Sequence, residues 1–273
     1  MADLRRLPRP VRQYLILYRA AARAALQYRF DFLSSLIGGI AFQGVQLLFL
    51  GVLLAKFELI AGWSFDEVGL LFAIRLAAHV VYIVPFHAVF YIDQVVNDGE
   101  YDRYLLRPVN PFVQLITRRF PAMAMGDVVL GVVALVVFAG RAPIDWTPAS
   151  VGFLVVAVIG GGLVEGGIQI ALSGLTFVAT TSMSARNFAD TMITTFGGYP
   201  LIMFGRLPFS LLTFVFPMAF IAYLPSAVLL GRTGETGLPV LLGWLSPVVG
   251  GLTFLAGFLI HRRLSRHFAS PGG

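Results

Sequence analysis

The chain contains no cysteine, and only one of its 273 residues is lysine. The missing cysteines exclude disulfides, thiolate metal sites and a cysteine nucleophile. The single lysine, Lys56, stands in the run Leu-Ala-Lys-Phe, so no G-x-x-x-x-G-K-[ST] phosphate-binding loop exists. The H-E-x-x-H and G-x-S-x-G signatures are also missing, and the four histidines are scattered. We therefore expect no metal site, no cofactor bound by this chain and no enzymatic activity of its own.

Charge is scarce as well: 12% of the residues are charged, whereas 58% are hydrophobic. This composition indicates an integral membrane protein that crosses the bilayer several times, not a soluble domain. The net charge of +6 comes almost entirely from arginine. In a membrane protein such an excess reports topology and contact with anionic headgroups, so we expect lipids and no nucleic acid among the partners. The first 30 residues lack the compact apolar core of a cleaved signal peptide.

Long hydrophobic runs predict an all-α fold with six membrane spans, each near the ~20 residues that a ~30 Å hydrocarbon core requires. The expected spans are 32–55, 67–91, 121–140, 150–181, 187–205 and 239–260. Before them, residues 1–30 carry apolar side chains at helical spacing with arginines between, which predicts a basic amphipathic helix on the inner membrane surface. The candidate residues of this interfacial helix and its junction with the first span are Arg19, Arg23, Arg29 and Asp31.

Prolines at positions 200, 208, 217 and 225 interrupt the chain after the fifth expected span begins. The ~12–14 Å of helix that fits between neighbouring prolines cannot cross a bilayer. We expect residues 208–230 to form two half-helices, a re-entrant hairpin in the outer leaflet between spans five and six. Its candidate gate residues are Pro208, Pro217, Tyr223 and Pro225.

The placement of arginine predicts that both termini are cytoplasmic, in the plasma or inner membrane of a cell. The N-terminal helix, the loop 93–120, Arg186 and the tail 261–267 would hold most of the arginines on the inner side. The outer side would hold only Lys56, Arg141, Arg206 and Arg232. A seventh full span at 208–230 would put the basic tail outside, against the positive-inside bias.

Polar residues inside the expected spans are candidates for a translocation path or a buried polar pair: Gln43, Gln46, Arg75, His79 and Glu165. The two glutamines share a helix face, and such amides more often hydrogen-bond to a neighbouring helix than to a substrate. Arg75 and His79 lie one turn apart on a helix. They face protein or a wet cavity, unless Arg75 snorkels to outer-leaflet phosphates with His79 packed beside it.

Glu165 lies within the spacing Gly162-x-x-x-Gly166, which allows two helix backbones to approach closely. A carboxylate at this depth in an apolar span must be protonated or paired. Arg75 is the candidate partner.

The loop 93–120 has an unusual composition for a connector. Asp98-Gly99 predicts a turn, residues 100–106 predict a short amphipathic helix, and Pro108 predicts its end near Arg107. The acidic residues near the start of this helix interact favourably with its dipole. Lying along the membrane with Tyr101, Tyr104 and Leu105 available for contact, the helix is suited to bind a cytosolic partner. The alternative is a solvated loop whose tyrosines lie among the headgroups.

The same loop resembles a known family. Residues 99–109, GEYDRYLLRPV, resemble the G-x-x-D-x-x-L-L-R-P-v signature of one branch of ABC type-2 transporter permeases. Residues 28–32, YRFDF, resemble the Y-R-x-D-F at the start of that branch's first span. Residues 214–226, FVFPMAFIAYLPS, resemble its f-v-i-P-x-a-f-i-x-y-x-P-a stretch. The tail is similar to its G-l-x-x-Y-x-x-x-G ending, with Phe268 in place of the tyrosine.

The resemblance implies a six-helix permease half that pairs with a second permease chain, identical or homologous. Two separate ATP-binding cassette ATPase subunits would dock on the N-terminal helix and on the loop 97–110, and would bind ATP and magnesium. It further implies export of an amphipathic, lipid-like or drug-like substrate. The candidate residues for coupling to the ATPase are Asp98, Gly99, Glu100, Tyr101, Asp102, Arg103, Arg107 and Pro108, although Arg107 also suits an anchor to lipid phosphates.

Two other function classes compete with this interpretation. The first is an ion- or proton-coupled secondary transporter that uses Arg75, His79 and Glu165. The second is a membrane enzyme acting on lipids, which the absence of a catalytic cluster disfavours.

Overall fold

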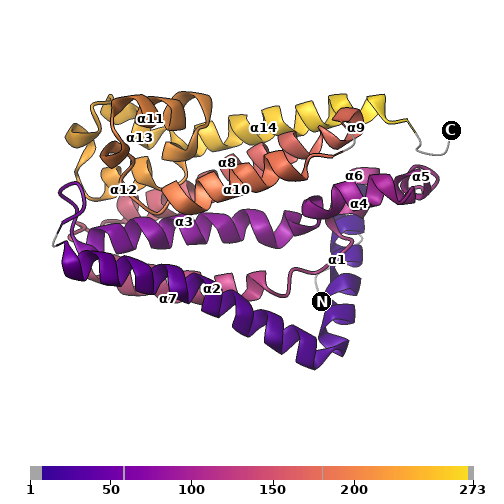
Figure 1. Cartoon of the computed structure of the whole chain (residues 1–273), viewed down its shortest axis with the longest axis horizontal. Helices are drawn as coiled ribbons and strands as arrows, with labels where there is room; N and C mark the ends of the chain where they lie inside the picture. Colours follow the sequence, from indigo (N-terminus) through magenta and orange to yellow (C-terminus); the bar gives the residue numbers. More distant parts are fainter. Residues whose placement is uncertain (1–7, 58, 180, 270–273) are drawn as a thin grey trace.

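The computed structural model describes residues 8–57, 59–179 and 181–269 of the chain (Figure 1). Its described part is a bundle of helices without a strand, apart from one isolated bridge between Ile60 and Trp63. The long helices are α1 (Arg9–Gln27), α2 (Arg29–Lys56), α3 (Phe65–Phe86), α7 (Ala124–Arg141), α8 (Pro148–Ser173), α10 (Met183–Phe196) and α14 (Ser246–Leu264).

Shorter helical segments occupy the two ends of the bundle. One end holds η2 (His87–Tyr91), α4 (Ile92–Asn97), α5 (Glu100–Leu105), α6 (Pro111–Ile116), α9 (Thr176–Ala179) and η7 (Ser265–His267) (Figure 1). The other end holds η3 (Leu201–Phe204), α11 (Arg206–Ser210), η4 (Leu211–Val215), η5 (Met218–Phe220), α12 (Tyr223–Leu229), η6 (Thr233–Thr236) and α13 (Val240–Trp244). The α1 helix lies across the first of these ends, together with the C-terminal end of α14.

Four helical stretches are long and apolar enough to cross a membrane, judged by length and composition. They are Arg29–Lys56, Phe65–Asn97, Ala124–Arg141 and Pro148–Ala179, which correspond to the first four expected spans. Local signals in the sequence begin two of these helices. Ser64 and Glu67 form a capping box at the start of α3, and Thr147 caps α8, which has Pro148 in its first turn.

The α1 helix confirms the expected helical pattern of the N-terminal segment over the residues described, while residues 1–7 of the expected range 1–30 lie outside them. Tyr28 is the single non-helical residue between α1 and α2, and the chain turns sharply there (Figure 1).

The expected span 187–205 is not one continuous helix. The α10 helix already begins at Met183, because Asp93 accepts hydrogen bonds from the Ser182 backbone and hydroxyl and fixes the helix start. The helix ends at Phe196, since Pro200 has no N–H and disfavours helix in the residue before it. Residues 187–205 therefore contain the last ten residues of α10, a turn and the short η3 segment.

The proline-rich segment after η3 is broken as expected, but its second half starts later. An apolar helical stretch, Arg206–Val215, forms the first half. Residues 217–222 make turns rather than a half-helix, and α12 begins only at Tyr223. This turn packs closely against α8, because a Cβ on Gly161 would lie 2.5 Å from the Ile221 carbonyl oxygen.

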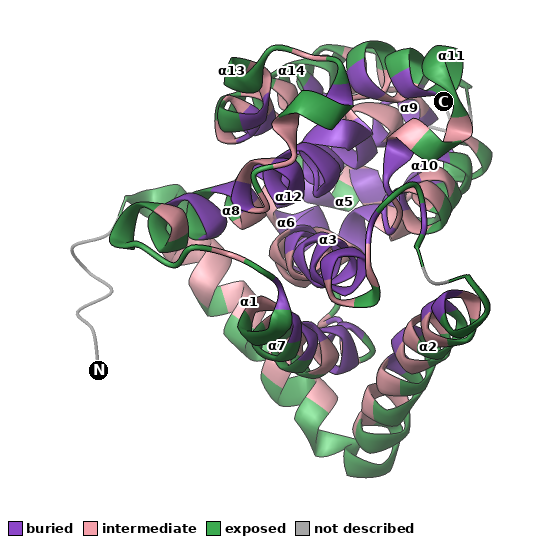
Figure 2. Cartoon of the chain, turned by 90° about the vertical axis from the view of Figure 1, so that its left-hand side faces the viewer, coloured by how far each residue is buried: buried purple, intermediate pink, exposed green. Residues whose placement is uncertain are grey.

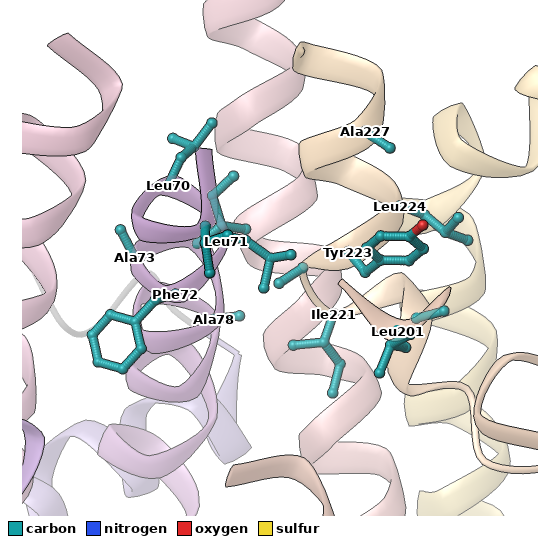
Figure 3. Packing of buried hydrophobic residues seen from close by; sticks show 14 of the residues in the cluster. Leu70, Leu71, Phe72, Ala73, Ala78, Leu201, Ile221, Tyr223, Leu224 and Ala227 are labelled. Carbon is teal, nitrogen blue, oxygen red and sulfur yellow. The ribbon is translucent and has the colours of Figure 1, made fainter. Parts of the chain in front are cut away.

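The core lies where α3, α8, α12 and the turn before α12 meet. Figure 3 shows Leu71 of α3 on the side of the helix that faces Ile221, Tyr223 and Leu224, and these side chains are buried. Figure 2 shows buried residues concentrated in this central region, whereas most of the surface of α2 is exposed. A bilayer or another chain is needed to cover such an apolar helix surface in water.

Glycines allow α8 to approach its neighbours at backbone distance. The predicted contact at Gly162 is confirmed, since a Cβ there would lie 2.6 Å from the Ala78 carbonyl oxygen of α3. A second pair, Gly160 and Gly167, faces α14, where a Cβ on Gly167 would lie 2.5 Å from the Thr253 carbonyl oxygen. The α7 helix approaches α2 equally closely, since a Cβ on Gly126 would lie 2.5 Å from the Leu36 carbonyl oxygen. These contacts fix the helices that carry the polar residues described next.

Candidate functional site

A cluster of polar side chains lies inside the bundle, where five of its long helices contribute one or two residues each. Gln43 comes from α2, Arg75 and His79 from α3, Asp127 from α7, Glu165 from α8 and Asp190 from α10. Arg75 and His79 lie one helical turn apart, so they face the same side of α3, as the sequence predicts. The glycine contacts of α8 with α3 bring Glu165 to the same face.

Glu165 pairs with His79 in this cluster. The Glu165 Oε1 atom lies 2.6 Å from His79 Nδ1, and the other ring nitrogen of His79 lies 3.9 Å from Asp127 Oδ2. Arg75 instead donates a hydrogen bond of 3.2 Å to Gln43 Oε1. The predicted Arg75–Glu165 pair is therefore wrong as a direct contact, since no ion pair joins the two among the residues that the structure describes. Arg75 still interacts electrostatically with Glu165, Asp127 and Asp190.

Several atoms of the cluster are buried without a hydrogen-bond partner among the described residues. They include Arg75 Nε, Glu165 Oε2 and His87 Nδ1. Arg75 is 2% exposed and Glu165 is fully buried, so neither polar group reaches the surface. Buried polar groups are normally hydrogen-bonded, so each exception calls for an explanation such as a bound water, an ion or a ligand.

All residues of the cluster except Glu165 line a cavity of about 430 Å³ between α2, α3, α7 and α10. Its polar wall contains Gln43, Arg75, His79, Asp127 and Asp190, and its apolar wall includes Phe42, Ile83 and Phe90. Gln46 lies elsewhere, beside a smaller cavity of about 290 Å³ lined by Tyr199 and Met203. Gln43 confirms the expectation that a glutamine here bonds to a neighbouring helix.

A second polar network joins the end of the α3–α4 stretch to α10. Arg186 Nη2 lies 3.2 Å from Asp93 Oδ2, and Arg186 Nη1 donates to the Val89 carbonyl oxygen at 3.0 Å. Asp93 also accepts hydrogen bonds from the hydroxyls of Thr176, Thr181 and Ser182. Both charged residues are buried, and this set of contacts links the loop 93–120 to the helix that carries Asp190.

The predicted coupling segment forms α5, preceded by Gly99 in a left-handed conformation (φ 70°). The expectation that Tyr101 and Tyr104 are available for contact is wrong, since both rings are buried. The Tyr101 ring packs 4.8 Å from Phe268 and 5.0 Å from Phe177, so the chain covers this apolar side of α5 with its own C-terminal segment. Burial raises the pKa of both tyrosines above 10 and keeps the phenols neutral.

The outward side of α5 carries other candidates. Leu106, which the sequence analysis did not single out, is 86% exposed, and Arg103, Arg107 and Pro108 are exposed around it. Asp98 is exposed and Glu100 is half-buried, with its carboxylate 3.0 Å from Arg118. The coupling candidates therefore divide between an outward surface, which we define as Asp98, Arg103, Leu106, Arg107 and Pro108, and residues that hold α5 to the bundle.

The N-terminal helix lies beside this end of the bundle. Tyr18 of α1 donates a hydrogen bond of 2.8 Å to the Val84 carbonyl oxygen, and Gln13 donates to the Pro108 carbonyl oxygen at 3.5 Å. The candidate residues of this helix and of its junction with α2 are all exposed: Arg19, Arg23, Arg29 and Asp31.

At the opposite end, the gate candidates are held in different ways. Tyr223 is buried and packs 5.7 Å from Trp63, and Pro225 is buried, whereas Pro208 is exposed and Pro217 is half-buried. At this end Arg232, which follows α12, forms a 2.8 Å ion pair with Glu67 of α3.

Three acidic residues of these clusters, Asp93, Asp127 and Asp190, were not identified from the sequence. Asp127 lies inside the expected span 121–140, and an ionisable residue in a span is a functional candidate by default, so that signal was available. Asp190 lies inside the expected span 187–205, so the same signal was available for it, whereas Asp93 fell in a segment expected to be a loop.

Comparisons with known proteins agree with the geometry of a membrane-embedded helical bundle. Residues 40–272 match the family described as ABC-2 family transporter protein. Searches of curated proteins and of solved structures found no match. The matched range covers most of the chain, including the polar cavity, α5 and the proline-broken segment. The chain therefore belongs to the ABC-2 transporter family and is a transmembrane permease of an ABC transporter, a membrane component that works with an ATP-binding subunit.

Proposed function

We propose that this chain is one permease half of an ATP-driven exporter of an amphipathic, lipid-like or drug-like substrate. ATP-binding cassette subunits dock on residues 97–110 and on α1, and they bind the ATP and magnesium. The observation that carries this proposal is the outward surface of α5, where a highly exposed Leu106 lies among Arg103, Arg107 and Pro108. An exposed apolar anchor surrounded by charge is a common feature of protein docking sites.

The contacts behind α5 support transmission of movement from the docked subunit. Tyr101 fixes α5 to the C-terminal segment, and Asp93 with Arg186 fixes the preceding helix to α10. The α10 helix carries Asp190 on the wall of the polar cavity. A displacement of α5 would therefore reach the cavity through packed and hydrogen-bonded groups.

A six-span topology with both termini cytoplasmic extends the four spans that composition identifies. The α14 helix has 19 residues and ends with His261, Arg262 and Arg263, which suits a span that ends at a headgroup surface. The α10 helix with η3 would form the fifth span, and Arg206–Leu229 the re-entrant hairpin. Pairing with a second permease chain, identical or homologous, would cover part of the exposed apolar surface of α2.

The contact between His79 and Glu165 supports a second candidate function. Two titratable groups 2.6 Å apart inside a membrane protein resemble part of a proton path. A secondary transporter would couple transport to this pair and would need no ATP-binding subunit.

Affinity purification from native membranes with mass spectrometry separates the two functions. We expect a soluble ATP-binding protein to co-purify, and the double variant Arg103→Glu/Leu106→Asp to lose it without loss of the folded chain. The matched control is Arg206→Glu/Leu207→Asp at the opposite end, where Leu207 is 72% exposed, and it should retain the partner. Retention by the first variant would overturn the docking surface, and recovery of the chain alone in several mild detergents would favour the secondary transporter.

A further inference from the structure

We infer that the cavity between α2, α3, α7 and α10 binds an amphipathic organic monocation, with its ammonium group at an aspartate of the polar wall, Asp127 or Asp190, and a hydrogen-bond acceptor against Arg75. This inference rests on the proposed transport function and specifies the substrate class. It follows from the charge of the cavity, from its unfilled hydrogen-bonding groups and from its apolar wall.

The charged groups around the cavity do not balance. Three carboxylates, Glu165, Asp127 and Asp190, face Arg75 and His79. His79 and Glu165 lie 2.6 Å apart and form a pair whose net charge is zero or negative. Arg75 then compensates one of the two aspartates. When both aspartates are ionised, at least one negative charge has no counter-charge in a region where an isolated charge is costly, so a ligand with one positive charge restores neutrality.

The aspartates also have free acceptor capacity. Among the described residues, Asp190 has no hydrogen-bond or ion-pair partner. Asp127 interacts with the side-chain amide of Gln43, and the basic nitrogen nearest to its carboxylate is a His79 ring nitrogen 3.9 Å away. Within the same described part of the chain, no group of three or more His, Asp and Glu side chains is placed to hold a metal ion. An organic ammonium, which needs two or three acceptors and no fixed coordination geometry, suits these aspartates.

Arg75 supplies an independent indication of a ligand. The side chain lines the cavity and is 2% exposed, yet its guanidinium makes one hydrogen bond, to Gln43, and its Nε–H group has no acceptor in the described residues. A buried guanidinium with unused donors binds an acceptor atom when one is offered. The ligand therefore carries an oxygen acceptor, such as a hydroxyl or carbonyl, near its ammonium group.

The rest of the cavity suits a hydrocarbon or aromatic body. Phe42, Ile83, Phe90 and Met123 form its apolar wall. Phe42 and Met123 are exposed, so the apolar side of the cavity continues to the surface of the bundle. A volume of about 430 Å³ is within the usual range for small-molecule sites. An amphipathic molecule can thus place its polar head against the aspartates and its apolar body along this wall.

The test uses the full chain in phosphatidylcholine nanodiscs and three probes with the same phenylethyl body: 2-amino-4-phenylbutan-1-ol (the amine), 4-phenylbutane-1,2-diol (the alcohol) and 2-hydroxy-4-phenylbutyrate (the carboxylate). Equilibrium dialysis measures their binding above that of protein-free nanodiscs. We expect the amine to bind and the alcohol and carboxylate to remain at the protein-free level. Equal binding of all three probes, or no binding of the amine, would overturn the inference even if every variant failed to fold.

Isosteric variants then locate the site. At least one of Asp127→Asn and Asp190→Asn should weaken binding of the amine by about tenfold or more, the loss expected for one charge-assisted hydrogen bond. Arg75→Gln should abolish the advantage of the hydroxyl, so that the amine binds no more tightly than 4-phenylbutylamine, which lacks an acceptor, whereas a purely structural role would weaken both alike. Asp145→Asn, at an exposed position, is the matched control and should have no effect. Unchanged affinity in both cavity variants would overturn the site.

The dialysis experiment separates this inference from the proposed function. Binding is measured without an ATP-binding subunit, so failure of that subunit to co-purify would overturn the proposed function and leave the amine result standing. Absence of amine binding by a chain that still recovers its ATP-binding subunit would overturn this inference alone.

Discussion

The glycine contact between α8 and α14 gives a prediction whose sign and size follow from geometry. A Cβ on Gly167 would lie 2.5, 2.6 and 2.7 Å from three backbone atoms of Thr253 and Phe254, whereas ordinary contact begins at 3.4 Å. Because backbone atoms cannot rotate away, Gly167→Ala must separate the helices by about 0.9 Å. Overpacking of this kind costs roughly 1–3 kcal/mol.

Gly152, on the same helix, is the matched control. A Cβ there would have no atom within 4 Å, and the residue is exposed. Replacing a glycine by alanine in an exposed part of a helix stabilises it by up to about 1 kcal/mol. The same chemical change on one helix should therefore shift stability in opposite directions at the two positions.

Thermal unfolding in detergent, monitored by the fluorescence of the three tryptophans, measures both effects. Thiol-reactive dyes cannot be used because the chain has no cysteine. At roughly 2–4 °C per kcal/mol for a chain of this size, Gly167→Ala should lower Tm by about 2–12 °C. Gly152→Ala should leave Tm unchanged or raise it by up to about 4 °C. Equal shifts for the two variants, or no decrease for Gly167→Ala, would refute the argument from close approach.

Further predictions concern the ion pairs and α5. Asp93→Asn keeps the side-chain shape but leaves buried Arg186 without a counter-charge, so we expect a loss of about 3–5 kcal/mol in the same assay. Glu235→Gln, at a half-exposed ion pair with Arg232, should change the free energy of unfolding by less than about 1 kcal/mol. A larger loss for Glu235→Gln than for Asp93→Asn would contradict the argument that buried ion pairs matter more than exposed ones. Tyr101→Ala should lower Tm while the folded fraction still recovers its ATP-binding subunit, whereas Leu106→Asp should lose that subunit at unchanged Tm. The reverse pattern in purification and melting experiments would show that the sides of α5 are wrongly assigned.

Hydrophobicity and helix signals predicted much of the fold from the sequence. The first four spans and the short helix α5 depend on local composition and on residues such as Gly99 and Pro108, which act within a few positions. The family resemblance rested on the same loop, and the match over residues 40–272 confirms it.

Partners inside the bundle could not be predicted in the same way. Whether Glu165 meets Arg75 or His79 depends on the rotation and relative depth of α3 and α8, which close glycine contacts set to within an ångström or so. One helical turn, about 5.4 Å, separates the two choices. Asp93 and Arg186 are likewise 93 positions apart, and neither residue carries a local signal for the other.

The single-residue connection at Tyr28 has a mechanical consequence. One residue supplies only two soft dihedral angles, so the end of α1 cannot move far without moving the start of α2. Gly39 of α2 packs against α7 at its glycine crossing, and Gln43 lies about 6 Å further along the helix. A force that displaces α1 would tilt α2 about that crossing and move Gln43 in the opposite direction. A force on α1 would therefore reach Gln43 in the wall of the cavity through this pivot. This route is separate from the one that runs from α5 through α10.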